Sequence, residues 1–74
     1  NLLQIQQLLL EETDEKHVLT VQQLIERLAE LEIPAERKSL YDDIATLQAF
    51  GLDVIATRSR ANIYSNWQQA FYAV

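Results

Sequence analysis

The chain contains no cysteine and has one histidine, one glycine and one proline among its 74 residues. Without cysteine, neither a disulfide nor a thiolate metal site can stabilise the fold. The absence fits a reducing compartment, so we expect the protein in the cytoplasm. His17 alone cannot build a metal cage, because a zinc site takes about four ligands, mostly His and Cys. We therefore expect no metal and no other cofactor.

Long hydrophobic runs are also missing. The first ten residues, NLLQIQQLLL, are interrupted by glutamines and are far shorter than the roughly 20 apolar residues that a membrane span needs. One His and one Gly supply neither a Ser–His–Asp set nor a phosphate loop, so we do not expect an enzyme. Because the chain starts at Asn1 rather than at Met, we expect it to be a piece of a longer protein.

The charge is acidic overall but unevenly distributed. Hydrophobic residues make up 49% of the chain, enough for the core of one small domain. The net charge is −5, which argues against general adhesion to nucleic acid. Residues 1–35 hold seven acids and two bases, whereas residues 36–74 hold four of each. A DNA-binding face must therefore lie in the second half.

Apolar residues recur at steps of three and four in three segments, the spacing of amphipathic helices. Thr20 is followed by Gln23, a capping-box signature for the start of the second helix. The segment Glu32-Ile33-Pro34-Ala35 ends that helix, because Pro34 lacks an N–H donor and clashes with the preceding turn. Gly51 is placed to close the third helix in a left-handed conformation. The predicted helices cover residues 2–12, 21–31 and 36–50.

After Gly51 the sequence changes in character. Residues 52–59 include β-branched side chains and predict a strand, and residues 70–74 predict a second one after a polar loop. The segment 17–19 predicts a brief strand, although an ordinary connector fits it equally well. Two helices joined by about four residues and followed by a β-hairpin indicate a winged helix-turn-helix, an α+β fold with three helices and a small antiparallel sheet.

In helix-turn-helix proteins, the N-terminal residues of the recognition helix face the DNA bases. The third predicted helix begins with ERKSLYDD. Arg37 and Lys38 can reach phosphates or the edge of a guanine. Ser39 and Tyr41 can donate hydrogen bonds to phosphate oxygens. Glu36 suits the start of the helix, where its charge complements the dipole.

Asp42 conflicts with this interpretation, because its position puts it on the outward side with Lys38 and Tyr41. Three explanations remain open. The carboxylate accepts a hydrogen bond from a cytosine, it marks the place where contact with DNA ends, or the helix does not bind DNA.

The predicted wing supplies two further cations, Arg58 and Arg60. With the pair in the third helix, four phosphate contacts give a slope of about −3.6 for log affinity against log salt, which is weak for one copy. Two copies, or further contacts in a longer chain, are needed for useful affinity. Tyr64 and Trp67 could stack on a sugar or a base, but we expect them to cover the small core or a partner chain.

The stretch IPAERKSLYDDIATLQAFGLDVI, with HVLT before the second helix, resembles the N-terminal winged helix-turn-helix of the WYL-domain transcriptional regulators of bacteria. The resemblance spans about residues 2–58, and the residues that match are Arg37, Lys38, Ser39, Leu40, Tyr41, Asp43, Ile44, Leu47, Gly51, Asp53 and Ile55. It implies sequence-specific binding of double-stranded DNA, usually as a homodimer, with ligand sensing in a C-terminal domain outside these residues. The predicted DNA contacts are Thr20, Arg37, Lys38, Ser39, Tyr41, Arg58 and Arg60.

The sequence departs from the family pattern in two places. Asp42 stands where the family usually has Arg, and the wing loop RANIYSNWQQ is longer than usual and lacks glycine. The alternative function is a winged helix used for protein contact or dimerisation. The acidic net charge, Asp42 and the apolar residues of the wing loop favour it.

Overall fold

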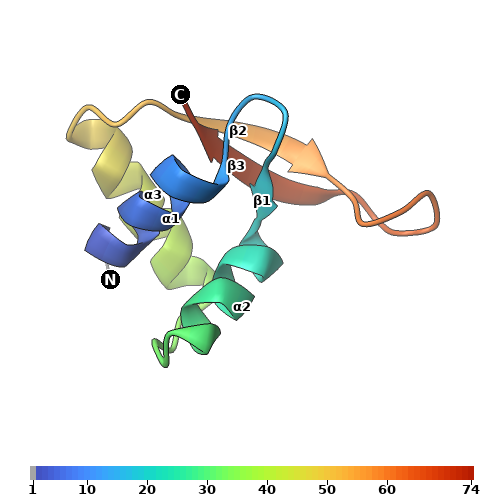
Figure 1. Cartoon of the computed structure of the whole chain (residues 1–74), viewed down its shortest axis with the longest axis horizontal. Coiled ribbons are helices and arrows are strands. Elements are labelled where there is room, and N and C mark those ends of the chain that lie inside the picture. Colours follow the sequence, from blue (N-terminus) through green and yellow to red (C-terminus); the bar gives the residue numbers. More distant parts are fainter. Residues whose placement is uncertain (1) are drawn as a thin grey trace.

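The computed structural model describes residues 2–74. Within them, three helices and a three-stranded antiparallel sheet form the predicted α+β fold, in an arrangement compatible with a winged helix (Figure 1). The elements in chain order are α1 (Leu2–Glu12), β1 (Leu19–Thr20), α2 (Val21–Glu30), α3 (Arg37–Ala49), β2 (Val54–Ser59) and β3 (Gln68–Ala73).

The helices have nearly the predicted bounds. The capping box at the start of α2 is present, because the Thr20 side chain accepts from the N–H of Gln23 and the Gln23 side chain accepts from the N–H of Thr20. Glu36 is the N-cap of α3, but its side chain makes no capping hydrogen bond. Leu31 and Phe50 are C-caps and not part of the helices, so α2 and α3 each end one residue earlier than predicted.

The two helices α2 and α3 end in the same type of turn. At α2, the N–H groups of Glu32 and Ile33 donate back to carbonyls of the last turn, and Glu32 has a left-handed φ of 62°. At α3, Gly51 and Leu52 make the equivalent bonds, and Gly51 has a φ of 101°. Both are Schellman motifs, in which the residue after the C-cap is left-handed. The predicted role of Gly51 is confirmed. Helix α2 ends at Glu30, and the left-handed Glu32 closes it before Pro34 is reached.

The sheet has the order β1–β3–β2, so β3 is central. Phe71 in β3 pairs with Leu19 on one side and with Ala56 on the other. The predicted brief strand exists, but it begins at Leu19, two residues later than predicted. The wing strands also shift: β2 begins at Val54, and β3 runs from Gln68 to Ala73. The start of β3 was missed because Gln68 and Gln69 are polar. Their pairing with Ser59 and Arg58 of β2 shows that they belong to the strand.

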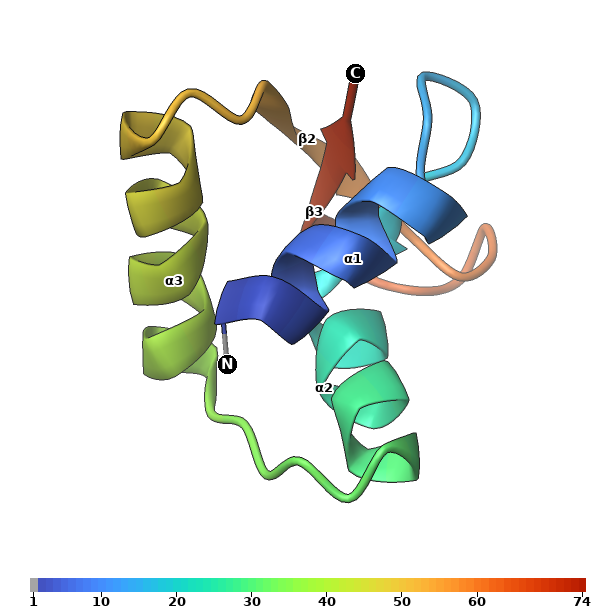
Figure 2. The ribbon, with the colours of Figure 1, turned by 60° about the vertical axis from the view of Figure 1, so that its left-hand side comes forward.

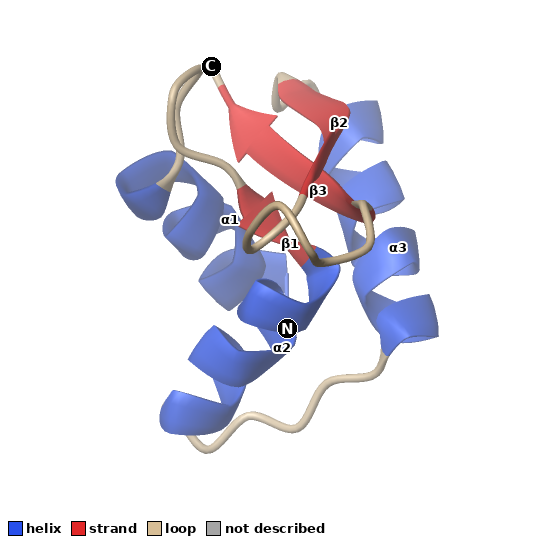
Figure 3. Ribbon diagram, turned by 90° about the vertical axis from the view of Figure 1, so that its right-hand side faces the viewer, coloured by secondary structure: helices blue, strands red, loops and turns tan. Residues whose placement is uncertain are grey.

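The core lies where the helices meet one side of the sheet (Figure 3). Helix α1 lies across the space between α2 and α3 (Figure 2). The predicted inward stripe of α3, Leu40, Ile44 and Leu47, is buried. The other buried apolar side chains in this cluster are Ile5, Leu8, Leu9, Leu19, Val21, Leu24, Leu28, Val54, Phe71 and Ala73.

The buried hydroxyl of Thr13 links α1 to β3 by hydrogen bonds. Thr13, which follows α1, is only 8% exposed, and its Oγ1 donates to the carbonyl of Leu9 at 2.5 Å. The same oxygen accepts from the N–H of Ala73 at 2.9 Å. Because β1 pairs with β3 only at Phe71 and Ala70, the N–H of Ala73 lies beyond the end of β1. The Thr13 hydroxyl therefore accepts the hydrogen bond that β1 is too short to accept from Ala73.

Candidate nucleic-acid interface

The first turn of α3 presents an exposed cationic surface. Arg37, Lys38 and Ser39 all have exposed side chains. Since the side chain of Glu36 makes no capping bond, it does not occupy the N–H groups of this turn. The positive end of the helix dipole therefore lies beside Arg37 and Lys38. An anion at this position would meet two side-chain cations and open backbone donors.

Tyr41 links this turn of α3 to the sheet. Its ring meets the ring of Phe71 edge-on, with centroids 6.2 Å apart and planes at 69°. The side chain is 37% exposed, so one side of the ring packs while another part faces solvent. Lys38 and Arg37 lie three and four residues earlier, on the same side of the helix. Tyr41 therefore has a packing role that its position in the sequence did not indicate.

The sheet continues this surface into the wing. Cross-strand partners lie on the same face of an antiparallel pair, and alternate residues along a strand share a face. Phe71 pairs with Ala56, so Gln69 and its partner Arg58 lie on the face of the sheet that Tyr41 contacts. A shallow hollow of about 360 Å³ opens beside them, lined by Ala56, Thr57, Arg58, Trp67 and Gln69.

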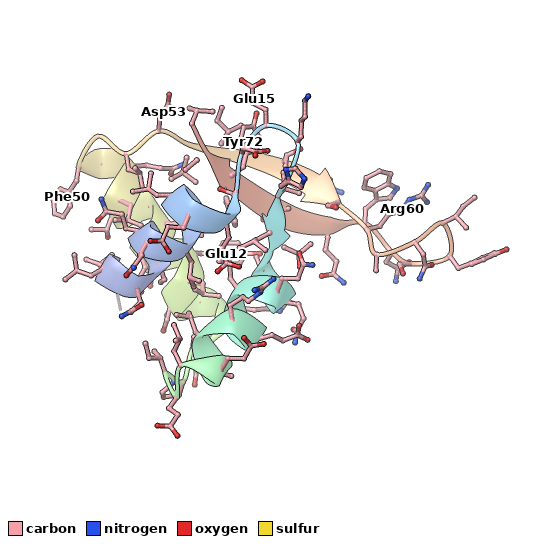
Figure 4. All side chains as sticks on the ribbon, viewed as in Figure 1. Glu12, Glu15, Phe50, Asp53, Arg60 and Tyr72 are labelled. Carbon is pink, nitrogen blue, oxygen red and sulfur yellow. The ribbon has the colours of Figure 1, made fainter. Side chains whose placement is uncertain are left out.

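Arg60 is held within the wing. Its guanidinium lies over the Trp67 ring, 4.6 Å from the centroid, and its Nη1 donates to the carbonyl of Ile63 at 3.3 Å (Figure 4). Trp67 is 56% exposed and Tyr64 is 94% exposed. These aromatic side chains were predicted to cover the core or a partner chain. They do not cover the core, since the hairpin extends beyond the helices and carries them away from it, and the partner chain stays a prediction.

Thr20 is the N-cap of α2 and does not line the hollow beside Arg58. Its side chain is buried, and its oxygen already accepts the capping hydrogen bond from Gln23. It lines a second hollow of about 280 Å³ between α2 and the wing, together with Gln22, Gln23, Glu26, Ser59, Arg60, Ala61 and Gln68. The carboxylate of Glu26 makes this hollow less favourable for phosphate than the first turn of α3.

No ion pair within residues 2–74 involves Arg37, Lys38, Arg58 or Arg60. The two pairs found there lie elsewhere: Arg27 contacts Glu12 at 2.7 Å, between α2 and α1, and His17 contacts Asp14 at 3.0 Å. The backbone hydrogen bond from Lys16 and the side-chain bond from His17 lower the pKa of Asp14 below its ordinary value. The four predicted cations keep their charge unneutralised by neighbouring carboxylates.

Asp42 is exposed on the outward side of α3, as predicted, together with Lys38 and Tyr41. Its backbone carbonyl accepts a hydrogen bond from the Thr46 hydroxyl at 2.9 Å. In the described part of the chain, its carboxylate has no hydrogen bond or ion pair. An unneutralised negative charge therefore lies one turn along the helix from Lys38.

The hairpin differs in charge from the rest of the molecule. Residues 54–74 contain Arg58 and Arg60 and no acid, so their net charge is +2. The other residues hold all eleven acids and four bases, a net charge of −7. A count by halves conceals this separation, because the acids of α3 are added to the same half as the wing. This separation of charge is visible in the sequence when residues 54–74 are counted as one unit.

Two kinds of site are absent from the described residues. No group of His, Asp and Glu side chains there is arranged to hold a metal ion. Each of the helices is too short or too polar to cross a bilayer.

Comparison of the chain with models of known protein families, with curated proteins and with solved structures found no match. The resemblance to the WYL-domain regulators therefore stays a prediction from the sequence.

Proposed function

We propose that this chain is a double-stranded-DNA-binding winged helix-turn-helix of a cytoplasmic transcriptional regulator. The supporting observation is that Arg37 and Lys38 are exposed and form no ion pair with any of residues 2–74. Their side of α3 joins, through Tyr41, the sheet face that carries Arg58. The first turn of α3 enters the major groove, and the wing contacts the adjacent backbone or minor groove.

The number of cations sets the strength of this contact. Four phosphate contacts give a slope of about −3.6 for log affinity against log salt, so a single copy binds weakly. Two copies on a pseudo-palindromic site give the additional contacts, which favours a homodimer in the working regulator. The acidic remainder of the molecule repels DNA wherever it approaches, and this repulsion favours a single orientation of the domain on the duplex.

A salt titration tests the proposal. Fluorescence anisotropy is measured against duplexes enriched by the chain from a random-sequence library. We expect the double variant Arg37→Ala/Lys38→Ala to lose about 1.8 units of the salt slope and most of its affinity. The matched control is Lys16→Ala, which removes one exposed cation from the loop between α1 and β1. Equal affinity and slope in the double variant and the control would refute DNA binding through α3.

Tyr41 needs a milder substitution than alanine, because its ring packs on Phe71. Tyr41→Phe keeps the ring and removes only the hydroxyl that is proposed to donate to a phosphate. We expect weaker DNA binding with unchanged circular dichroism and thermal midpoint. If the variant binds DNA like the wild type, the Tyr41 hydroxyl does not contribute to the interface.

A second candidate function is protein contact through the wing. The exposed side chains of Ile63, Tyr64 and Trp67, at 70%, 94% and 56%, favour it. It predicts association that depends on protein concentration without DNA, together with a shift in the emission of Trp67, the single tryptophan. Sedimentation velocity that shows only a monomer, with unchanged emission, would count against this function.

A further inference from the structure

The tip of the wing, residues 60–67, exposes more apolar surface than a turn requires. Tyr64 is 94% exposed and Ile63 is 70% exposed. Turns between strands are usually made by Gly, Asn, Asp, Ser and Pro, whose backbones and short side chains suit the reversal. Two large apolar residues at the end of a projecting hairpin therefore need an explanation other than turn formation.

Hydrogen bonds within the wing tip fix the backbone of the turn. The side chain of Asn62 accepts from the N–H of Tyr64 at 2.8 Å, and its carbonyl accepts from the N–H of Ser65 at 3.1 Å. Arg60 crosses the turn and donates to the carbonyl of Ile63 at 3.3 Å. The backbone of the turn is therefore fixed around Ile63 and Tyr64, so little backbone freedom is lost when they meet a partner.

Two cations precede the apolar end. Arg60 lies over the ring of Trp67, which covers one face of the guanidinium, and its Nη1 donates to the carbonyl of Ile63, so its remaining N–H donors can bind an anion. Arg58 lies two residues earlier, within β2, and residues 54–74 contain no acid. A partner that suits this wing has dense negative charge outside and apolar surfaces inside. Duplex DNA has both, since phosphates line the minor groove and the stacked faces of the bases are apolar where a base step opens.

We propose that the wing tip acts as a wedge that inserts Ile63 or Tyr64 into the minor groove and bends the duplex. This inference rests on the DNA binding proposed above. Apolar side chains inserted at a base step partly unstack it and kink the DNA, while Arg58 and Arg60 bind the nearby phosphates. Because pyrimidine–purine steps unstack most easily, the wedge selects those steps at a fixed distance from the site of α3.

Variants of the wing tip test the wedge. The probes are duplexes enriched by the wild-type chain and labelled at both ends, so that energy transfer reports the bend. We expect Ile63→Ala and Tyr64→Ala each to reduce the bend and to weaken binding, by about tenfold for Tyr64. The salt slope should stay unchanged, because no cation is removed. Trp67 emission should change on DNA addition in the wild type.

The matched control is Phe50→Ala. Phe50 is 78% exposed and lies at the opposite end of the molecule from Arg60 (Figure 4). We expect this variant to bind and bend DNA like the wild type.

The outcomes separate the wedge from the proposed function. Tip variants that bend DNA as strongly as the wild type would overturn the wedge and leave DNA binding intact. A wild-type chain that enriches no duplex would overturn both. Trp67 emission that changes with protein concentration, without DNA, would assign the tip to protein contact and would also overturn the wedge.

Discussion

Replacement of Thr13 by Val removes one hydroxyl from the junction between α1 and β3 and preserves the shape of the side chain. The Leu9 carbonyl keeps a partner, because it also accepts from the N–H of Thr13 at 3.2 Å. The N–H of Ala73 loses the acceptor that it has at 2.9 Å. Ala73 is 5% exposed, so water cannot readily replace the hydroxyl.

A buried donor without a partner costs about 1–3 kcal/mol of unfolding free energy. For a domain of this size, 1 kcal/mol lowers the thermal midpoint by about 4–8 °C, so a loss of about 2 kcal/mol corresponds to about 8–16 °C. Thr13→Ser is the control, because it keeps the oxygen and removes one methyl, which costs about 0.8 kcal/mol. We therefore expect the Val variant to be the less stable of the two.

Thermal unfolding followed by circular dichroism gives the midpoints, and hydrogen exchange reports on the bond itself. The amide of Ala73 should exchange faster in Thr13→Val and stay protected in Thr13→Ser. A Val variant as stable as the wild type, with a protected Ala73 amide, would refute the role assigned to the hydroxyl.

Two further predictions concern the helix ends and Asp42. Glu32 and Gly51 occupy the same left-handed position at the ends of α2 and α3. Glu32→Gly should stabilise the fold by about 0.5–1 kcal/mol, because glycine adopts this conformation without strain. Gly51→Ala should destabilise it by about 1 kcal/mol through backbone strain alone, since no atom lies within 4 Å of the Cβ that alanine adds. Urea unfolding checks both, and shifts of the same sign in both variants would contradict the explanation. Asp42→Asn should raise DNA affinity about twofold, since a unit charge about 8 Å from a phosphate in water costs about 0.5 kcal/mol. Anisotropy at low salt measures this change, and weaker binding would instead assign Asp42 to a base contact.

The sequence predicted the elements well where the signal is local. Helix periodicity identified the buried stripe of α3, and the Thr20–Gln23 pair identified the start of α2. Gly51 marked the end of α3, because a left-handed residue at that point favours glycine. The same type of turn at Glu32 was missed, since glutamate gives no such signal and the left-handed angle follows from how Ile33 packs against the core.

The candidate interface depends more heavily on contacts between distant residues. The outward direction of Lys38, Tyr41 and Asp42 follows from helix geometry and was predicted. The edge-on contact of Tyr41 with Phe71 joins residues thirty positions apart, and only the packing of α3 on the sheet brings them together. Of the two positions predicted for Tyr64 and Trp67, on the core or on a partner chain, the first is wrong, because aromatic composition does not indicate how far a hairpin extends beyond a small core.

By itself, the sequence determined the order of helices and strands, the apolar side of each helix and the location of the cations, since these follow from spacing along a few neighbouring residues. Only the tertiary structure decided that Thr13 reaches Ala73, that Arg60 lies over Trp67 and that Tyr41 of α3 packs on Phe71 of β3. Each of these contacts depends on where separate elements meet. That geometry is set by the packing of the whole core and by the register of the sheet, neither of which is encoded within a single segment.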